Sequence, residues 1–148
     1  MRAAPPEGGA YLNLPASGEG DRLRWKGLHM DNYAEGKLGE VRAEQYLAGL
    51  GYTILERNFT CYGSEIDLIA ADGSAIVFIE VKTRVRALAS SGREAVTPAK
   101  QRRICKGAMY YMMKNGLMNR QARFDVVEIH GARIAHIKNA FPYQGPAY

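Results

Sequence analysis

The sequence predicts a single α/β domain in which helices pack on one mixed sheet. Two helix-like patterns alternate with runs of β-forming residues, and the expected order is helix, three strands, helix, two strands. The chain has 148 residues, of which 47% are hydrophobic and 24% are charged. These values are typical of one folded domain with a core of ordinary size rather than of a disordered chain.

The N-terminal segment differs in composition from the rest of the chain. Residues 1–30 are rich in Pro, Gly and Ala and lack a hydrophobic period, which predicts a flexible extension before a domain at residues 31–148. Met30 stands directly before the first expected element, so we hypothesise that the natural protein starts there. Mass measurement of the native N-terminus would disprove this hypothesis if the product began at Met1.

The expected helices are marked by their capping signals. Asn32, followed three residues later by Glu35, resembles a capping box, and this helix is expected to run to about Leu50. The second helix is bracketed by Thr97 as N-cap, Pro98 at the first helical position and Gly116 after the last turn (its Tyr110 to Met113 could form core or an interface). The expected strands are Tyr52–Phe59, Glu65–Ala71, Ser74–Lys82, Arg123–Ile129 and Arg133–Ile137.

Several classes of protein are disfavoured by composition. The longest apolar runs, such as Ala75 to Ile79, are too short to cross a bilayer, and no signal-peptide pattern opens the chain. The two cysteines, Cys61 and Cys105, are expected to be reduced thiols, which fits a cytoplasmic protein.

Positive charge is concentrated in one segment. The net charge is +5, but between Lys82 and Lys106 there are eight basic residues and one acid, Glu94. That segment therefore carries +7 and the rest of the chain −2. Such a field suits a polyanion such as nucleic acid, although a solvated surface would have the same composition.

A predicted hairpin gathers the candidate catalytic residues. If Asp72-Gly73 forms a two-residue turn, Ala71 pairs with Ser74, and Asp67 becomes a diagonal neighbour of Glu80. Because side chains alternate along a strand, four charged residues then share one face, whereas the other face is entirely apolar. The four charged residues are Glu65, Asp67, Glu80 and Lys82. The apolar face consists of Ile66, Leu68, Ala70, Ala75, Val77, Ile79 and Val81.

Clustered carboxylates indicate a metal site. They repel one another unless they are protonated or neutralised, and hard oxygen ligands suit Mg²⁺ or Mn²⁺. Lys82 could orient a water or stabilise charge on a phosphate, although Glu-x-Lys is also a common pattern on exposed strands. On the first helix, Glu40 extends the stripe of Ala43, Leu47 and Leu50, so it either joins the site or merely favours the positive helix end.

Basic residues near the start of the second helix are candidates for phosphate contacts. Lys100, Arg102 and Arg103 oppose the helix dipole, so helix stability does not explain them. Arg84, at the start of a loop expected to be mobile between residues 84 and 96, is a further candidate.

Several of these motifs together resemble the bacterial YraN-like family over residues 31–142. The resemblance is carried by Gly36-Lys-Leu-Gly39-Glu40, Glu65-Ile-Asp67-Leu-Ile, Phe78-Ile-Glu80-Val-Lys82-Thr-Arg84, Glu94-Ala-Val, Lys100 and Arg123-Phe-Asp125-Val-Val. The family usually has Gly directly before the Glu-Ile-Asp run, where this chain has Ser64.

The family is similar to archaeal Holliday-junction resolvases and to the PD-(D/E)xK restriction-endonuclease-like superfamily. The resemblance implies that superfamily's mixed central sheet with flanking helices. It also implies that Asp67 and Glu80 are metal ligands, that Lys82 is the catalytic lysine and that Glu40 is a carboxylate near the metal. Resolvases act as dimers on two-fold substrates, which is compatible with a homodimer here.

The expected function is therefore a Mg²⁺- or Mn²⁺-dependent nuclease acting on DNA, including branched or flapped structures. Two alternatives remain: a nucleic-acid-binding protein that keeps the fold but does not cleave, and a hydrolase of small phosphate esters. The second has little support, because no Gly-rich phosphate loop, His-rich metal motif or nucleophile elbow is present.

Overall fold

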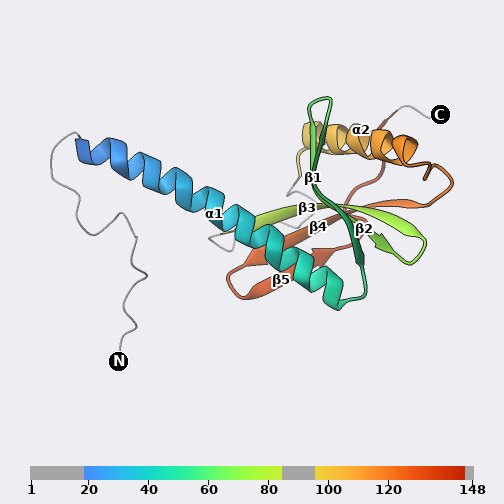
Figure 1. The fold of residues 1–148 in the computed structure, drawn as a ribbon, viewed down its shortest axis with the longest axis horizontal. Coiled ribbons are helices and arrows are strands. Elements are labelled where there is room, and N and C mark those ends of the chain that lie inside the picture. Colours follow the sequence, from blue (N-terminus) through green and yellow to red (C-terminus); the bar gives the residue numbers. More distant parts are fainter. Residues whose placement is uncertain (1–18, 85–95, 146–148) are drawn as a thin grey trace. The chain divides into compact units, whose positions relative to one another are not determined.

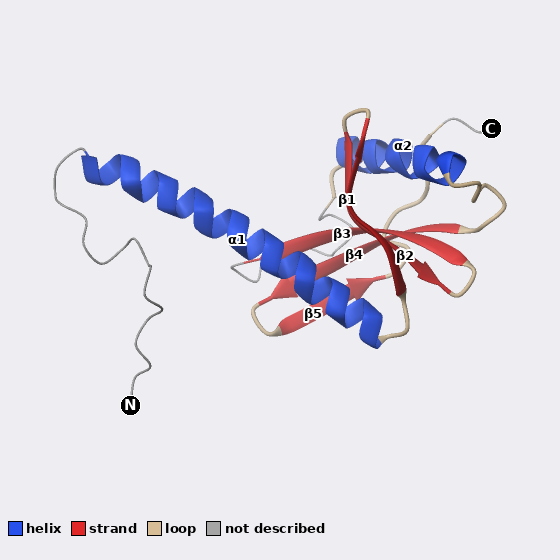
Figure 2. Cartoon of the chain, in the orientation of Figure 1, coloured by secondary structure: helices blue, strands red, loops and turns tan. Residues whose placement is uncertain are grey.

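The computed structural model describes residues 19–84 and 96–145, with side chains described from residue 33 onward. Five strands form one mixed sheet, and two helices accompany it (Figures 1 and 2). The helices are α1 (Glu19–Gly49) and α2 (Pro98–Lys114). The strands are β1 (Thr53–Cys61), β2 (Ser64–Asp72), β3 (Ala75–Arg84), β4 (Ala122–His130) and β5 (Arg133–Ile137). The predicted mixed α/β fold is thus confirmed. Of the loop expected at residues 84–96, Arg84 is instead the last residue of β3, and residues 85–95 lie outside the described residues.

The first helix begins earlier than expected. It starts at Glu19, so the prediction of a capping box at Asn32 and Glu35 is wrong, and residues 19–30 are helical rather than irregular. The physical reason is local composition: no proline occurs between Pro15 and Pro98, and good helix formers such as Arg and Leu follow Asp21. The chain divides into two compact units between Lys37 and Leu38, and the unit from Leu38 onward contains the sheet.

The sheet has the strand order β1-β2-β3-β4-β5, with neighbouring strands antiparallel except for the parallel pair β3–β4. Hydrophobic clusters cover both of its faces. On one face, Ile104 and Ala108 of α2 pack with Phe78, and on the other, Ala43 and Leu47 of α1 pack with sheet residues. Leu50, expected on the same stripe of α1, is exposed because the helix ends at Gly49.

The register of β2 against β3 differs by two residues from the expected one. Asp72 pairs with Ala75, so Gly73 and Ser74 form the turn instead of Asp72 and Gly73. Of the two turn residues, only Gly73 has a positive φ, 57°, as is required at the first central position of a type II′ turn. Because the shift is even, the expected alternation of faces survives along β3.

Along β2 the alternation breaks near Asp67. Ile66 was predicted to share the face of Leu68, but it belongs to the cluster under α2, whereas Leu68 faces α1. Ser64 accompanies Ile66: a Cβ on Gly107 of α2 would lie 2.1 Å from the Ser64 hydroxyl and 3.2 Å from Ile66. The first half of β2 is therefore turned toward α2, and the absence of a side chain at Gly107 permits this approach.

The second helix agrees with its capping signals. The Thr97 hydroxyl accepts a hydrogen bond from the backbone N–H of Lys100 at 3.2 Å, Pro98 follows, and Gly116 has a φ of 66° after the last turn. Of the aromatic and methionine residues that could form core or an interface, Tyr111 and Met112 are buried. Their neighbours Tyr110 and Met113 are partly buried and exposed, respectively.

A buried ionic network stabilises the face of the sheet opposite α2. Asp125 has no exposed surface. It accepts hydrogen bonds from Arg123 at 2.9 Å and from the backbone N–H of Asn139 at 2.9 Å, and it lies 2.8 Å from His136. Burial by itself would raise the pKa of Asp125, but these partners hold the pKa below its usual value. Because these hydrogen bonds and ion pairs compensate the buried charge of Asp125, we interpret the network as structural.

Two further findings bear on the expected environment of the protein. Cys61 and Cys105 are free thiols, the second of them buried. None of the helices in the described part of the chain combines the length and the apolar character needed to cross a bilayer.

Candidate functional site

Charged side chains gather where the second half of β3 meets β2 and the start of α2. Carrying the β2–β3 register one pair beyond Leu68–Ile79 brings Asp67 opposite Glu80. The Asp67 carboxylate accepts a hydrogen bond from the backbone N–H of Val81 at 2.8 Å. This hydrogen bond lies just beyond the last backbone pair of β2 and β3, Leu68–Ile79. It therefore holds the Asp67 carboxylate between the two strands.

Asp67 lies in an environment that disfavours its charge. Burial, together with the neighbouring charges of Glu80 and Glu40, raises the pKa of Asp67 from the usual 3.8 to about 7. The Val81 N–H and the Lys100 ammonium act in the opposite direction without cancelling it. A carboxylate held in this state is one that a cation would stabilise.

Glu80 is more deeply buried than Asp67, with an exposed fraction of 4%. Its Oε1 lies 2.9 Å from the Lys82 ammonium and 3.5 Å from that of Lys100. Its Oε2 is buried and has no hydrogen-bond partner among the described residues. An unsatisfied buried carboxylate oxygen costs on the order of 1–3 kcal/mol or more, so this atom needs a partner such as a cation or a water.

Glu40 reaches this region because α1 approaches the sheet closely at the preceding residue. A Cβ on Gly39 would lie 2.1 Å from the Thr83 hydroxyl of β3, so only glycine allows this contact. Glu40 is partly buried, and its charge raises the pKa of Asp67. Glu40 therefore lies close enough to Asp67 for its charge to act on that carboxylate.

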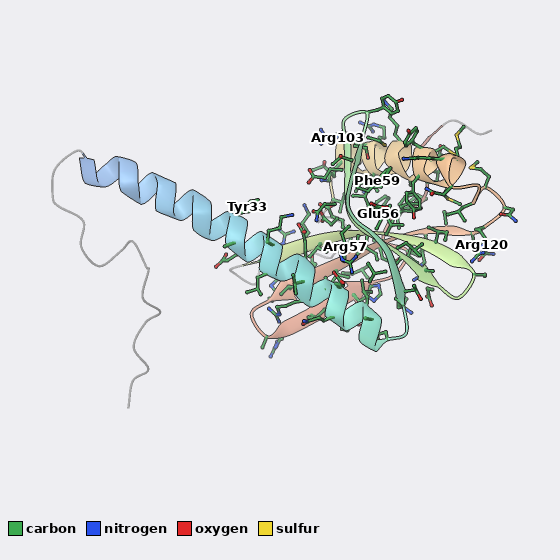
Figure 3. All side chains as sticks on the ribbon, viewed as in Figure 1. Tyr33, Glu56, Arg57, Phe59, Arg103 and Arg120 are labelled. Atoms are coloured by element: carbon green, nitrogen blue, oxygen red, sulfur yellow. The ribbon has the colours of Figure 1, made fainter. Side chains whose placement is uncertain are left out.

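The remaining predicted site residues separate into two groups. Lys100, expected to contact phosphate, lies within the carboxylate cluster beside Glu80. Arg102 and Arg103 are exposed on α2, where Figure 3 labels Arg103. Glu65, which was placed on the face of the charged cluster, is exposed near the β1–β2 turn and is not among the charges that act on Asp67. Its expected place in the cluster is wrong, because the side-chain alternation of β2 breaks near Asp67, between Ile66 and Leu68.

Glu128 of β4 is a further buried acid, which the sequence patterns did not indicate as a candidate. It aligns with Lys82 across the parallel β3–β4 pair, with an exposed fraction of 6%. Arg84 lies 3.9 Å from its Oε1 and His130 lies 3.4 Å from its Oε2. The alternation of side chains along β4 shows which face Glu128 occupies. Its place beside Lys82 depends on the register between two parallel strands joined through a helix, which the sequence pattern does not give.

The geometry limits what a metal site here could contain. Within the portion of the chain that the structure describes, no three His, Cys, Asp or Glu side chains come together as a ready set of metal ligands. Asp67 and Glu80 alone would supply two carboxylates to a cation, which would leave further positions to water or substrate, as Mg²⁺ commonly accepts.

Comparison with known proteins places the chain in a family. Residues 39–129 match the model described as "Uncharacterised protein family UPF0102". The chain belongs to this family. A UPF0102 protein of Geotalea uraniireducens is 47% identical over 116 residues, which cover 75% of this chain and 91% of the relative. A UPF0102 protein of Persephonella marina is 41% identical over 112 residues, covering 76% and 97%.

The matched range contains most of the candidate site. It extends from Gly39, directly before Glu40, to Ile129, directly after Glu128. The expected membership of an uncharacterised bacterial family is confirmed, whereas the relation to resolvases stays a prediction.

Proposed function

We propose that this UPF0102 protein is a divalent-metal-dependent phosphodiesterase that cleaves DNA, with branched or flapped DNA as its substrate class. The observation that carries the proposal is the buried pair Asp67 and Glu80 flanked by the ammonium groups of Lys82 and Lys100. The mixed sheet with α2 between β3 and β4 is compatible with the restriction-endonuclease-like fold that the sequence resemblance implies.

The residues present fit a hard divalent cation such as Mg²⁺ or Mn²⁺. The Oε2 of Glu80 has no hydrogen-bond partner among the described residues, and the negative charge of Asp67 is destabilised by its surroundings. Both carboxylates could therefore gain by donating an oxygen ligand to a cation. Asp67 and Glu80 would hold the ion, and Glu40, whose charge acts on Asp67, would bind a second ion or a metal-bound water. A cation held there supplies Lewis acidity, which neutralises charge on a phosphate and acidifies water.

The two lysines have distinct places in this chemistry. Lys82 is anchored by Glu80 and is 31% exposed, so its ammonium is oriented while remaining accessible to a phosphate. It would stabilise the negative charge that develops on the phosphate oxygens, an effect that is large in a water-poor site. Lys100 projects from the start of α2 toward the same carboxylate and would add to this positive field. Arg84, Arg102 and Arg103 would contact the DNA backbone without reading its sequence.

One observation favours a second function, nucleic-acid binding without cleavage. Two ammonium groups already lie within 2.9 and 3.5 Å of Glu80, so the Asp67–Glu80 pair has two positive charges beside it without any metal. In that case the cluster would be a structural ion-pair network, and DNA affinity would fall steeply with salt but would not depend on metal.

Cleavage assays on the full-length protein separate the two functions. Labelled duplex, flap and four-way-junction DNA are incubated with Mg²⁺, Mn²⁺ or EDTA, and Asp67→Asn is compared with Glu65→Gln. The second variant removes an exposed carboxylate two residues away on the same strand, so it controls for the loss of charge. Metal-dependent cutting that only Asp67→Asn abolishes supports the nuclease, and metal-independent binding without cutting supports the alternative.

A further inference from the structure

A groove along α2 combines aromatic rings with positive charge. It lies between the β1–β2 turn, the outer surface of α2 and the segment before Gly145, and its volume is about 340 Å³. Its lining includes the rings of Tyr62, Tyr110 and Tyr143, the cations Arg102 and Lys106, and two methionines. Cavities of this size class commonly hold small ligands.

Tyr62 is the most unusual residue of this groove. It is 75% exposed, so it contributes little to the core. It also occupies a turn position with a φ of 45°, followed by Gly63 with a φ of 76°. Asn is favoured at such a position and an aromatic residue is disfavoured, by roughly 1 kcal/mol. Neither turn formation nor core packing therefore explains a tyrosine here.

The rings of the groove are fixed but open. Tyr110 stacks on Phe59 of β1, with ring centres 6.4 Å apart and an interplanar angle of 26°, and Figure 3 labels Phe59 beside α2. Tyr62 stands at 87° to Tyr110, with ring centres 5.3 Å apart. The two rings are therefore not stacked on each other, and the exposure of Tyr62 leaves its ring surface available to a planar ligand.

Positive charge surrounds these rings. Arg102 and Lys106 line the groove. Burial raises the pKa of the neighbouring Cys61 thiol, and the charges of Lys106 and Lys114 oppose that rise, which places both ammonium groups near the turn. Aromatic faces beside cations are the combination that binds unpaired nucleotides, because bases stack on the rings and phosphates meet the cations.

The groove and the carboxylate cluster are connected by α2. Lys100 contacts Glu80. Lys106 lies six residues further along the same helix, which corresponds to about 9 Å along its axis and about 120° around it, so a strand that reaches both sites must pass around α2. We propose that this groove holds an unpaired stretch of the DNA substrate, with a base stacked on Tyr62 and phosphates near Arg102 and Lys106. This inference rests on the proposed function and specifies its substrate as DNA with an unpaired strand.

A second copy of the chain is a poorer occupant. In a two-fold interface the same patch meets itself, so Arg102 and Lys106 would oppose their own counterparts. Like charges brought together in this way destabilise an interface. The charge of the groove thus favours a polyanion.

The test uses single-stranded oligothymidylate that carries one 2-aminopurine, whose fluorescence is quenched by stacking. Binding to the full-length protein is measured in EDTA, where no metal-dependent cleavage can occur. Tyr62→Asn is compared with Tyr62→Phe, and Tyr33→Ala serves as the control, since Tyr33 is also exposed but does not line the groove. Asn suits the turn, so loss of folding would not explain an effect.

We expect quenching by the wild type, Tyr62→Phe and Tyr33→Ala, and a dissociation constant about 5- to 100-fold higher for Tyr62→Asn, with quenching lost. Unchanged affinity and quenching in Tyr62→Asn would overturn the proposal, as would a Tyr62-dependent dimer in sedimentation experiments. Quenching without nuclease activity would contradict the proposed function alone, whereas nuclease activity without quenching would contradict the groove proposal alone.

Discussion

Removing the charge of Asp67 should change how the stability of the protein depends on pH. Asp67→Asn keeps an oxygen that can accept the hydrogen bond from Val81, so the variant removes the charge with little change of shape. The groups that act on Asp67 come from three elements: Glu40 of α1, Glu80 of β3 and Lys100 of α2. All three remain in the variant.

The size of the effect follows from the pKa of Asp67. The folded-state pKa is about 7 and the usual value is 3.8. Between these values the folded state binds more protons than the unfolded state, so the wild type loses stability as pH rises through this window. Each pKa unit corresponds to about 1.4 kcal/mol, which gives a loss of up to about 4 kcal/mol from pH 4 to pH 8. From about pH 8 upward, one unit above the folded-state pKa, the loss is nearly complete and constant.

The assay is urea denaturation followed by circular dichroism at several pH values in EDTA, for the wild type, Asp67→Asn and Glu65→Gln. We expect the free energy of unfolding of the wild type to fall relative to Asp67→Asn as pH rises, while Glu65→Gln follows the wild type. At pH 8, Mg²⁺ should restore stability to the wild type, by about 2.7 kcal/mol at one hundred times its dissociation constant. A difference between wild type and Asp67→Asn that stays constant from pH 4 to pH 8 would refute the reasoning.

Three further predictions concern the lysine, the helix contact and the exposed arginines. Lys82→Ala should lower the single-turnover cleavage rate by about 10²- to 10³-fold while changing DNA affinity much less; an unchanged rate would remove Lys82 from the catalytic role. Gly39→Ala should destabilise the protein by about 1–3 kcal/mol in urea denaturation, because the new Cβ meets the Thr83 hydroxyl, and Thr83→Ala should recover most of this loss. Replacing Arg102 and Arg103 by Ala should reduce the slope of log Kd against log salt for duplex DNA by about 2, and an unchanged slope would show that neither contacts phosphate.

Local signals in the sequence were sufficient where the structure depends on local chemistry. Thr97, Pro98 and Gly116 predicted the ends of α2 correctly, because capping depends on residues within one turn. Alternation along β3 predicted the shared face of Glu80 and Lys82 for the same reason. Where local preferences were averaged over a longer segment, as in residues 19–30, a helix was missed.

Packing between distant elements could not be predicted from these patterns. The β2–β3 register was wrong by two residues because Gly73 suits more than one turn type. The place of Lys100 beside Glu80 depends on where α2 crosses the sheet, and the place of Glu128 depends on the parallel β3–β4 register. Both positions follow from tertiary structure, which determines the charged neighbours of Asp67 and Glu80.

Metal binding by the carboxylate pair is the central claim, and titration with Mn²⁺ examines it most directly. Free Mn²⁺ is followed by electron paramagnetic resonance at pH 8, where Asp67 is ionised, for the wild type, Asp67→Asn and Glu65→Gln. We expect saturable binding to the wild type and to Glu65→Gln, and loss of that binding in Asp67→Asn. Equal binding by all three proteins, or no binding by the wild type, would contradict it.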